Sequence, residues 1–429
     1  MKRVLLLATT TGYQTRMFAE AAARLGVELV YATDRCDQLD DPWRDRAIAV
    51  RFHEEGRSID AVLKARDSRP IDALLAVGDR PTVLAAHLAL RLGLPGHPPE
   101  AAAAARDKRQ TRAKLKSADL FTPGFITVPV GADAMNLAGG LSFPVVVKPT
   151  VLSGSRGVIR ADDRLSFVAA FDRVRRLLAS SEVRELRDPD ADVIQVEEYI
   201  PGSEYALEGL VENGRLRTLA IFDKPDPLDG PFFEETIYVT PSRTNAGMHQ
   251  QIEAAVGAAI AALGLHHGPI HAECRVNSRG VVVLEVAARP IGGLCAKSLR
   301  FQAIGLSGHQ AIQTIRFEEF LLRHALGDPM IGWTREEKAS AVMMIPIPRG
   351  GVYRRVDGVE AASQVPHVEE IQITAKPDQQ LLALPEGASY LGFIFARAPL
   401  AAEAEHAVRE AHARLRFTID PLIAVSQAS

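Results

Sequence analysis

The sequence predicts an α/β protein that divides into three units. Its first hundred residues alternate short apolar strands with helical segments, which is typical of an open parallel sheet. From about residue 98 longer strands, long helices and a β-hairpin follow, and from about residue 334 short strands precede one charged helix. A chain of 429 residues is long enough for two to four domains. We therefore expect domains at 1–97, 98–333 and 334–429.

The composition is that of an ordinary globular protein. Hydrophobic residues make up 47% and charged residues 24%, with a formal net charge of −3. Non-specific nucleic-acid binding needs a basic surface, so no nucleic-acid partner is expected. The first apolar run is too short for a signal peptide, and no window reaches the roughly 20 apolar residues that span a bilayer. Cys36, Cys274 and Cys295 show no metal-ligand spacing and are odd in number. We expect a cytoplasmic protein with reduced cysteines and no membrane partner.

The first unit reads as a Rossmann-like βαβ domain. Apolar strands are predicted at 4–8, 27–33 and 73–77, and helices near 14–25, near 58–67 and up to Leu92. The strands end in Thr9-Thr10-Thr11-Gly12 and in Gly78-Asp79-Arg80, where sheets of this kind bind ligands. No G-x-G-x-x-G follows the first strand, so a nicotinamide site is not indicated. The Gly- and Pro-rich segment 93–99 marks the first domain boundary.

The middle unit mixes strands and helices with one long loop. Strands are predicted at 144–149 and 192–200, and helices near 163–180 and 246–263. The segment 222–244, rich in Pro, Asp and Phe, is predicted to be a loop, and the stretch after Gly292 and Gly293 to be helical.

The segment 271–289 is predicted to be a β-hairpin. A three-residue loop ending in Gly280 would join the two strands, and pairing Asn277 with Val281 would place Glu273 opposite Glu285. Like charges in that position are destabilising, so a cation is expected between them, and Mg²⁺ is the natural candidate. The alternatives are a solvated sheet face neutralised by neighbouring arginines, or a register shifted by one residue.

Two further residues of this hairpin carry candidate chemistry. Strand alternation puts Glu285, Ala287 and Arg289 on one face, so Arg289 is placed to hold a carboxylate or stabilise an oxyanion. Its alternative role is that of a counter-ion to the two acids. His271 shares the face of Glu273 and is a candidate substrate contact, with a hydrogen-bonded structural histidine as the alternative.

A lysine and a Gly/Ser loop form a candidate phosphate site. Lys148 ends an apolar strand, and Ser153, Gly154, Ser155 and Gly157 follow it closely. Backbone N–H groups in such a loop can cradle phosphates, and a nearby ammonium group neutralises their charge. The loop is not a Walker A motif, and an exposed lysine beside an ordinary turn is the alternative. Lys108 sits in a charged helix and is a weaker candidate.

A strand end at 196–204 forms a candidate nucleoside site. It carries Glu197, Glu198 and Glu204 around a Pro-Gly turn. Backbone groups at a strand end can read an adenine edge, and a carboxylate just beyond can accept two ribose hydroxyls. The alternative is a solvated strand end with scattered glutamates.

Taken in this order, the motifs resemble those of the ATP-grasp superfamily over nearly the whole chain. Within it the sequence looks most like the bacterial L-amino-acid ligases, which are dipeptide synthetases, and related carboxylate–amine ligases. The resemblance rests on Asp107-Lys108 and on the segments 143–149, 196–204, 271–289 and 341–358. It implies an α/β ATP-grasp fold with an N-terminal Rossmann-like parallel-sheet domain, a lid subdomain at about 119–195 and a small α+β C-terminal domain.

The resemblance also implies roles for the candidate residues. Lys108 and Lys148 would contact ATP phosphates, and Ser153, Gly154, Ser155 and Gly157 would close over them as part of the mobile lid. Glu197 and the Ile200 backbone would read adenine, and Glu204 the ribose. Glu273 and Glu285 would bind one or two Mg²⁺ ions, with Mn²⁺ as an alternative, and Arg289 would hold an acyl phosphate. Many ATP-grasp enzymes carry Asn at the position of Ala287 as a further metal ligand, whereas the amino-acid ligases resemble Glu-x-Ala-x-Arg, so the number of metal ions stays open.

The function implied is ATP-dependent amide formation between a small-molecule carboxylate and amine, with two amino acids expected as substrates. The reaction would pass through an acyl phosphate and release ADP and phosphate. Gly292 and Gly293 beside Arg289 leave room for a bulky substrate side chain, and the loop from Lys224 to Glu235 is a candidate substrate gate. The alternatives are a biotin-carboxylase-like or purine-pathway ligase and a non-catalytic ATP-binding protein. A homodimer is the default expectation for the assembly.

Overall fold

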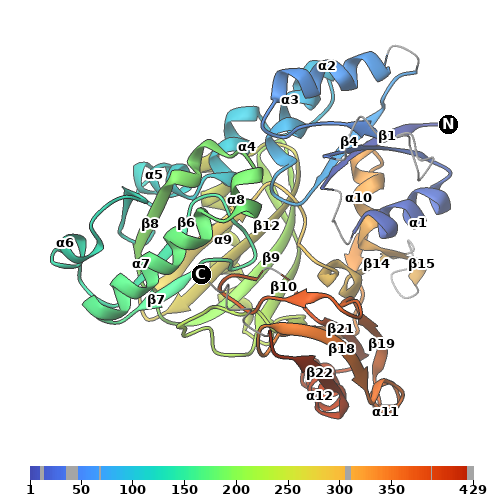
Figure 1. Cartoon of the computed structure of the whole chain (residues 1–429). Coiled ribbons are helices and arrows are strands. Elements are labelled where there is room, and N and C mark those ends of the chain that lie inside the picture. The colour runs from blue at the N-terminus through green and yellow to red at the C-terminus, as the bar shows by residue number, and fades with distance from the viewer. Residues whose placement is uncertain (10–13, 35–46, 67–68, 305–310, 388, 423–429) are drawn as a thin grey trace.

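The computed structural model describes residues 1–9, 14–34, 47–66, 69–304, 311–387 and 389–422. Figure 1 shows the N-terminal domain in blue, a lid in green and the C-terminal unit in orange and red, arranged around a central sheet. Three residues of the first predicted strand end, 10–12, and Cys36 lie outside the described residues. Among the described residues, no helix combines the length and apolar character that crossing a membrane requires.

The N-terminal domain is a four-stranded parallel sheet in the order β3-β2-β1-β4. Its strands are β1 (Arg3–Ala8), β2 (Glu28–Thr33), β3 (Ile48–Ala49) and β4 (Ala73–Val77), and its helices are α1 (Thr15–Leu25), α2 (Glu55–Arg66) and α3 (Thr82–Leu92). The predicted βαβ order is confirmed, although the two residues of β3 are too few to give a sequence pattern. Parallel strands have their carboxyl ends at one edge, so Thr9 and Asp79 face the same side of the domain.

The lid is an antiparallel sheet in the order β5-β8-β6-β7, covered by helices. The strands are β5 (Phe125–Pro129), β6 (Val145–Pro149), β7 (Ile159–Ala161) and β8 (Val193–Glu198), and the helices are α6 (Ala134–Ala138), α7 (Arg164–Leu178) and α8 (Ser181–Glu185), with a 3-10 turn η1 (Pro189–Asp192). Phe167, Phe171 and Val174 bury one face of α7 against the sheet. Two helices, α4 (Pro99–Arg106) and α5 (Lys108–Ser117), connect the lid to the N-terminal domain.

The central sheet has eight strands in the order β13-β12-β9-β10-β11-β17-β21-β19. Its strands are β9 (Ser203–Glu212), β10 (Arg215–Lys224), β11 (Ile237–Thr240), β12 (Gly268–Asn277), β13 (Gly280–Ala287), β17 (Ala339–Ile345), β19 (Val368–Ile373) and β21 (Gly392–Ala398). Helix α9 (Ala246–Leu263) packs on β13 and β10, and α12 (Ala401–Arg414) packs on β17 and β21. Because β11 pairs with β17, the sheet continues through the boundary predicted near residue 333.

Smaller elements complete the fold. One three-stranded sheet has the order β15-β14-β16 and another has the order β20-β18-β22. Their bounds and those of the neighbouring helices are β14 (Arg300–Ile304), β15 (Ala311–Arg316), β16 (Trp333–Arg335), β18 (Gly351–Asp357), β20 (Gln380–Leu381), β22 (Arg416–Asp420), η2 (Cys295–Ser298), α10 (Phe317–Ala325) and α11 (Val359–Ser363). Helix α10 packs against α1, which ties the N-terminal domain to the rest of the chain.

The predicted hairpin is β12–β13, and Glu273 does pair with Glu285. The predicted turn is nevertheless wrong: Asn277 pairs with Gly280, so the loop has two residues rather than three. A β-bulge between the pairs of Glu273 and Cys274 leaves one extra residue, Leu284, on β13. The shorter turn and the extra residue compensate, which restores the predicted facing of the two acids.

Two other predictions about the middle unit are wrong. The segment 222–244 is not one loop, because β10 continues to Lys224 and β11 occupies Ile237–Thr240. The stretch after Gly293 forms only the short 3-10 turn η2 before β14 begins, so it is not a helical segment. The conformation of β11 is decided by its pairing with β17, which is distant in sequence.

Candidate active site

One cavity of about 620 Å³ lies where the N-terminal strand ends, the lid and the central sheet meet. All the predicted site residues line it except Gly157. That glycine, with φ +74°, packs against Pro149 and Leu177, and its N–H donates to the Pro385 carbonyl oxygen at 2.8 Å. The predicted phosphate role of Gly157 is therefore not supported by its position. Ser153, Gly154 and Ser155 do face the cavity.

Lys108 reaches the Gly/Ser loop from α5. Its ammonium group donates to the Leu152 carbonyl oxygen at 2.8 Å. Asp107 caps the same helix by accepting from the N–H groups of Arg109 and Gln110. The cap fixes the start of α5, so Lys108 is held at the loop that the sequence proposes for phosphate binding.

Glu197 lies in a buried ion cluster whose arginine the sequence did not indicate. Its carboxylate accepts from Arg112 Nε at 2.8 Å and from Lys148 Nζ at 2.7 Å. Burial would raise the pKa of Glu197, but Arg112 and Lys148 lower it to about 2. Burial lowers the pKa of Lys148 to about 8 although Glu197 opposes that shift. Both groups are thus charged near pH 7, and the predicted phosphate lysine and adenine-reading acid are bound to each other.

The backbone predicted to read adenine, at Ile200, is also fixed by an arginine. Arg275 donates to the Ile200 carbonyl oxygen at 2.7 Å and to Glu204 Oε2 at 2.9 Å. Arg275 is buried, and its guanidinium lies 5.3 Å from the centre of the Tyr199 ring. The turn after β8 is therefore held to β12 by one side chain.

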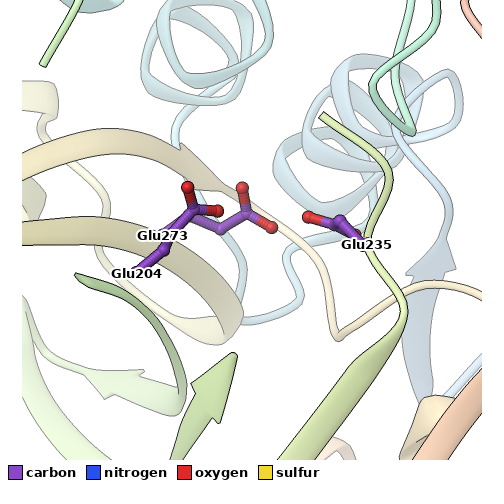
Figure 2. A group of neighbouring side chains, drawn as sticks. All are labelled: Glu204, Glu235 and Glu273. Carbon is purple, nitrogen blue, oxygen red and sulfur yellow. The ribbon is translucent and has the colours of Figure 1, made fainter. Parts of the chain in front are cut away.

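Lys224 occupies the centre of three carboxylates, from Glu204, Glu235 and Glu273. The ammonium group lies 2.7, 2.7 and 2.9 Å from their oxygens, and the lysine side chain is 3% exposed. Figure 2 shows that Glu204 and Glu273 come from adjacent strands of the central sheet, whereas Glu235 approaches from the other side. Their carboxylate oxygens lie within 4.8 Å of one another. We call these four residues the Lys224 cluster.

The charges of the Lys224 cluster shift the pKa values of its members. Burial opposes a charged lysine, but the three carboxylates raise the pKa of Lys224 well above its usual value. Burial and the neighbouring Glu273 raise the pKa of Glu235 to about 7. Lys224 and Glu235 were predicted only as the ends of a gate loop, and Glu204, predicted to bind ribose, is already bound to Lys224 and Arg275.

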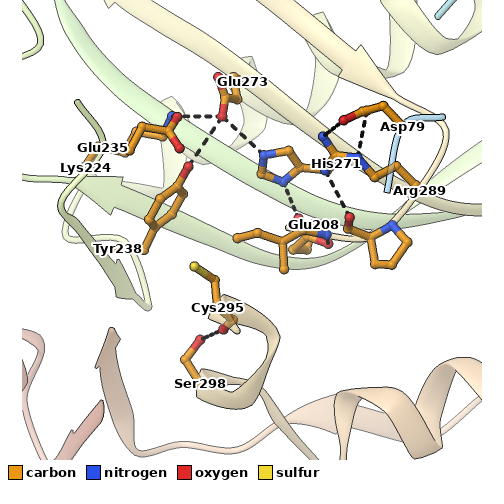
Figure 3. Close-up of polar contacts among 12 residues, drawn as sticks. Asp79, Glu208, Lys224, Glu235, Tyr238, His271, Glu273, Arg289, Cys295 and Ser298 are labelled. Carbon is orange, nitrogen blue, oxygen red and sulfur yellow. Dashed lines mark hydrogen bonds and ion pairs between the residues drawn. The ribbon is translucent and has the colours of Figure 1, made fainter. Parts of the chain in front are cut away.

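His271 connects Glu273 to the turn that follows β13. Its Nε2 lies 3.3 Å from Glu273 Oε1, and its Nδ1 pairs with the fully buried Glu208. Glu208 also accepts from the Ile291 N–H at 3.1 Å. Figure 3 shows His271 between Glu208 and Glu273. Burial would lower the pKa of His271, but Glu208 and Glu273 raise it to about 9. His271 is thus both a hydrogen-bonded structural histidine and a cation on the cavity wall.

Arg289 pairs with the N-terminal domain rather than with the hairpin acids. Its Nε and Nη2 donate to the two oxygens of Asp79 at 2.8 and 3.1 Å, and its Nη1 donates to the Pro290 carbonyl oxygen at 3.0 Å. The guanidinium outweighs burial and lowers the pKa of Asp79. Arg289 was expected, as an alternative, to be the counter-ion of Glu273 and Glu285. In the structure the acid that it pairs with is Asp79.

The two hairpin acids offer oxygen donors that fit a hard divalent cation. Glu273 and Glu285 are paired across the strands and line the same cavity, and Glu285 is half-buried. Lys224 and His271 already supply positive charge to Glu273, so the charge argument alone does not require a metal. A metal ion is favoured instead by the carboxylate oxygens of the two acids and by the partial exposure of Glu285 to the cavity.

Gly292 and Gly293 line the cavity together with two tyrosines, a cysteine and a methionine. Tyr238, Cys295, Met344 and Tyr390 line it, and they come from β11, η2, β17 and the segment before β21. A Cβ atom at Gly293, whose φ is +60°, would lie 3.4 Å from the Phe393 ring. The C-terminal unit therefore contributes to this wall, which sequence reasoning did not indicate.

Three family models match successive parts of the chain. They are the ATP-grasp N-terminal domain at residues 19–96, the ATP-grasp domain at 141–298 and the L-amino acid ligase C-terminal domain 2 at 343–420. The crystal structure of an L-amino acid ligase from Bacillus licheniformis superposes with a TM-score of 0.80 at 27% identity, over 98% of this chain and 99% of that one.

Sequence relatives include two enzymes that match part of the chain. An alanine–anticapsin ligase of Bacillus subtilis is 28% identical over 251 residues, which covers 56% of this chain and 52% of the relative. The carnosine synthase 1 of Gallus gallus is 30% identical over 251 residues, which covers 57% of this chain and 27% of that protein. The predicted fold class and family are confirmed by the three domain matches and the superposition. The chain carries an ATP-grasp N-terminal domain, an ATP-grasp domain and the C-terminal domain 2 of the L-amino acid ligases, and it shares its fold with an L-amino acid ligase.

Proposed function

We propose that the protein is an ATP-dependent carboxylate–amine ligase that joins two amino acids through an amide bond. The observation that carries the proposal is the composition of the cavity. Phosphate-binding candidates Lys108 and Lys148, the acids Glu273 and Glu285, and Arg289 all line it. The L-amino acid ligase C-terminal domain supplies Met344 and Tyr390 to its lining.

The reaction would proceed in two steps. An oxygen of the first substrate's carboxylate attacks the γ-phosphorus of ATP, so ADP leaves and an acyl phosphate forms. The amine of the second substrate then attacks the acyl carbon and loses a proton, and phosphate leaves as the amide forms. Lys108 and Lys148 offset charge on the phosphoryl oxygens, and Arg289 stabilises the tetrahedral oxyanion.

The remaining roles follow from the same proposal. Glu273 and Glu285 would hold one or two Mg²⁺ ions, or Mn²⁺, which when bound neutralise phosphate charge. Glu197 and the Ile200 backbone would recognise adenine, and Glu204 the ribose. His271 would contact substrate as a cation, and the segment between Lys224 and Glu235, with Leu228 and Phe233 on the cavity wall, would act as a substrate gate. A cytoplasmic location and a homodimeric assembly remain predictions.

An ADP-release assay over an amino-acid panel, with product masses recorded, tests the proposal. We expect ADP release only when a pair of amino acids is present, together with a product of dipeptide mass. A biotin-carboxylase-like enzyme would instead release ADP with bicarbonate and biotin, and a purine-pathway ligase with phosphoribosylamine. Absence of amino-acid-dependent ADP release would contradict the proposal.

The substitution Glu285→Gln distinguishes the proposed ligase from a non-catalytic ATP-binding protein. This change removes a proposed metal ligand while preserving the shape of the side chain, so we expect turnover to fall by roughly 100-fold or more. The amide variant of an exposed acid that lies away from the cavity, Glu360→Gln, is the matched control, and its turnover should stay unchanged. Equal activities of the two variants would contradict the metal assignment.

A further inference from the structure

We propose that Asp79 recognises the α-ammonium group of the amino acid whose carboxylate is activated, an inference that rests on the ligase function proposed above. Asp79 would then make the enzyme selective for α-amino acids over carboxylic acids that lack an amino group. The argument depends on where Asp79 lies, on how it is paired with Arg289, and on what an incoming substrate does to that pair.

Asp79 enters the cavity from the N-terminal domain. It follows β4 directly, after Gly78, whose φ of +86° lets the chain turn at the end of the strand. Its side chain is 25% exposed, so a ligand can reach it. Figure 3 shows that it lies across from the end of β13, with its carboxylate directed at Arg289.

Arg289 and Asp79 form a two-point ion pair between domains. Both guanidinium–carboxylate contacts are short, at 2.8 and 3.1 Å, and the Pro290 carbonyl oxygen holds the third nitrogen at 3.0 Å. A carboxylate offers about four acceptor positions. Arg289 takes two and Ser153 takes one, which leaves a position open for an N–H group of a substrate.

A bare carboxylate would bind poorly at this pair. To reach Arg289 it must replace Asp79, and a partly buried Asp79 would then lose its cation, which is a strongly unfavourable change. An α-amino acid avoids the loss because it carries both charges on one carbon. Its carboxylate binds Arg289 while its ammonium group binds Asp79, so every charge keeps a partner.

Apart from Glu285, which is proposed to hold a metal ion, the cavity acids discussed above are bound to other cations. Glu197 binds Arg112 and Lys148, and the three acids around Lys224 share its ammonium group. Asp79 is the acid paired with Arg289, the side chain proposed to receive the activated carboxylate. A group on the carbon next to that carboxylate, such as an α-ammonium, would thus lie beside Asp79.

The test compares an amino acid with its des-amino analogue as acyl donor. L-phenylalanine and 3-phenylpropanoate share a carbon skeleton, and an amino acid methyl ester serves as an acceptor that can act only as the amine. In the wild type we expect kcat/KM to favour phenylalanine by roughly 100-fold or more, because a site built to bind a polar group rejects an analogue without it. If another amino acid proves the better donor, the pair of that amino acid and its own analogue replaces this one.

Asp79→Asn should lower the amino acid/des-amino ratio by roughly 10- to 100-fold, the range of one charge-assisted hydrogen bond. The loss should fall on KM for the amino acid, with KM for ATP unchanged and turnover of the analogue unchanged or increased. Asp79→Glu, which keeps the charge, should retain more of the preference. Glu28→Gln breaks a separate ion pair in the same domain and should leave the ratio unaltered.

Three results would overturn the inference. Equal loss of both donors in Asp79→Asn would assign Asp79 a structural role only, and thermal unfolding of the variant would confirm that role. A wild type that accepts the des-amino acid as readily as the amino acid would also contradict selectivity by Asp79. If the wild type releases ADP with no amino acid, the ligase proposal fails and this inference fails with it.

Discussion

Replacing Lys224 with Met should destabilise the protein and convert the Lys224 cluster into a metal-dependent site. The change removes the ammonium group that lies within 2.7 to 2.9 Å of three carboxylates while preserving most of the side-chain volume. Glu204, Glu235 and Glu273 would then lack their common cation. Their oxygens lie within 4.8 Å of one another, close enough to share one divalent ion.

The magnitude follows from these distances. Two unit charges 4.8 Å apart repel by about 3.5 kcal/mol at an effective dielectric constant of 20. Protonation of one acid relieves part of this, and removal of one partner from a buried pair typically costs about 3–5 kcal/mol. For a unit the size of the middle domain, each kcal/mol lowers Tm by roughly 2–4 °C. We therefore expect a decrease of roughly 6–20 °C without metal.

The assay is thermal unfolding in EDTA and in excess Mn²⁺. A ligand at 100 times its Kd stabilises the folded state by about 2.7 kcal/mol, so Mn²⁺ should recover part of the lost Tm in the variant. Mn²⁺ should raise the Tm of the wild type less, because Lys224 already neutralises the cluster.

Lys297→Met is the control, because it removes an ammonium group that lies 2.6 Å from Glu370, whose side chain is 46% exposed. The Lys297 side chain is itself 12% exposed, but a pair whose acid is open to solvent contributes at most about 1 kcal/mol. The reasoning is refuted if Lys224→Met unfolds with the wild type in EDTA, or if Mn²⁺ stabilises both proteins equally.

Three further predictions concern stability and nucleotide binding. Arg112→Met should lower the free energy of unfolding by about 3–5 kcal/mol, because it removes one cation from the buried Glu197 and a donor from the Leu284 carbonyl oxygen. Denaturant unfolding measures this loss. A loss below about 1 kcal/mol would contradict a stabilising role of the Glu197 ion cluster. Burial, with smaller contributions from His267 and Arg217, lowers the pKa of His324 to about 4. The folded state therefore favours the neutral imidazole, and the free energy of unfolding should fall by up to about 3 kcal/mol as the pH drops from 6.5 to 4. His324→Phe should flatten that pH profile, and an unchanged profile would refute the assignment. Gly202→Ala should weaken ATP binding and lower the free energy of unfolding by about 1–3 kcal/mol, because φ is +125° and the new Cβ would lie 2.2 Å from the Val276 carbonyl oxygen. Gly56→Ala in α2 is the control, since no atom would lie within 4 Å of its new Cβ.

Local patterns predicted β1, β2, β4, β6, β8 and the hairpin β12–β13, together with the longer helices, whereas the central strands β9 and β10 were not predicted. The strand at Ala73–Val77 and the helix at Ala246–Leu263 have the predicted bounds, because each is a continuous apolar or amphipathic run with glycine or a cap at its end. The β11 strand was missed because it has four residues and pairs over its whole length with β17, which is distant in sequence. The pairing of Glu273 with Glu285 was predicted correctly although the predicted turn was wrong. The β-bulge adds the residue that the shorter turn lacks, and this restores the predicted pairing.

The candidate site was predicted as a set of residues but not as a set of contacts. The acids, the lysines and Arg289 that the motifs indicated line one cavity. Their partners could not be predicted, because Arg112 lies 85 residues from Glu197, and Asp79 lies 210 residues from Arg289. Charged side chains so far apart in sequence meet only through the packing of whole domains, which leaves no local pattern to detect.

Transfer of oxygen from substrate to phosphate tests the central claim most directly. The enzyme would be supplied with ATP, an amine acceptor and an amino acid whose carboxylate carries ¹⁸O. If that carboxylate attacks the γ-phosphorus, each amide formed should be matched by one ADP and one phosphate that contains a single ¹⁸O atom. Unlabelled phosphate, or AMP and pyrophosphate in place of ADP and phosphate, would contradict an acyl-phosphate ligase.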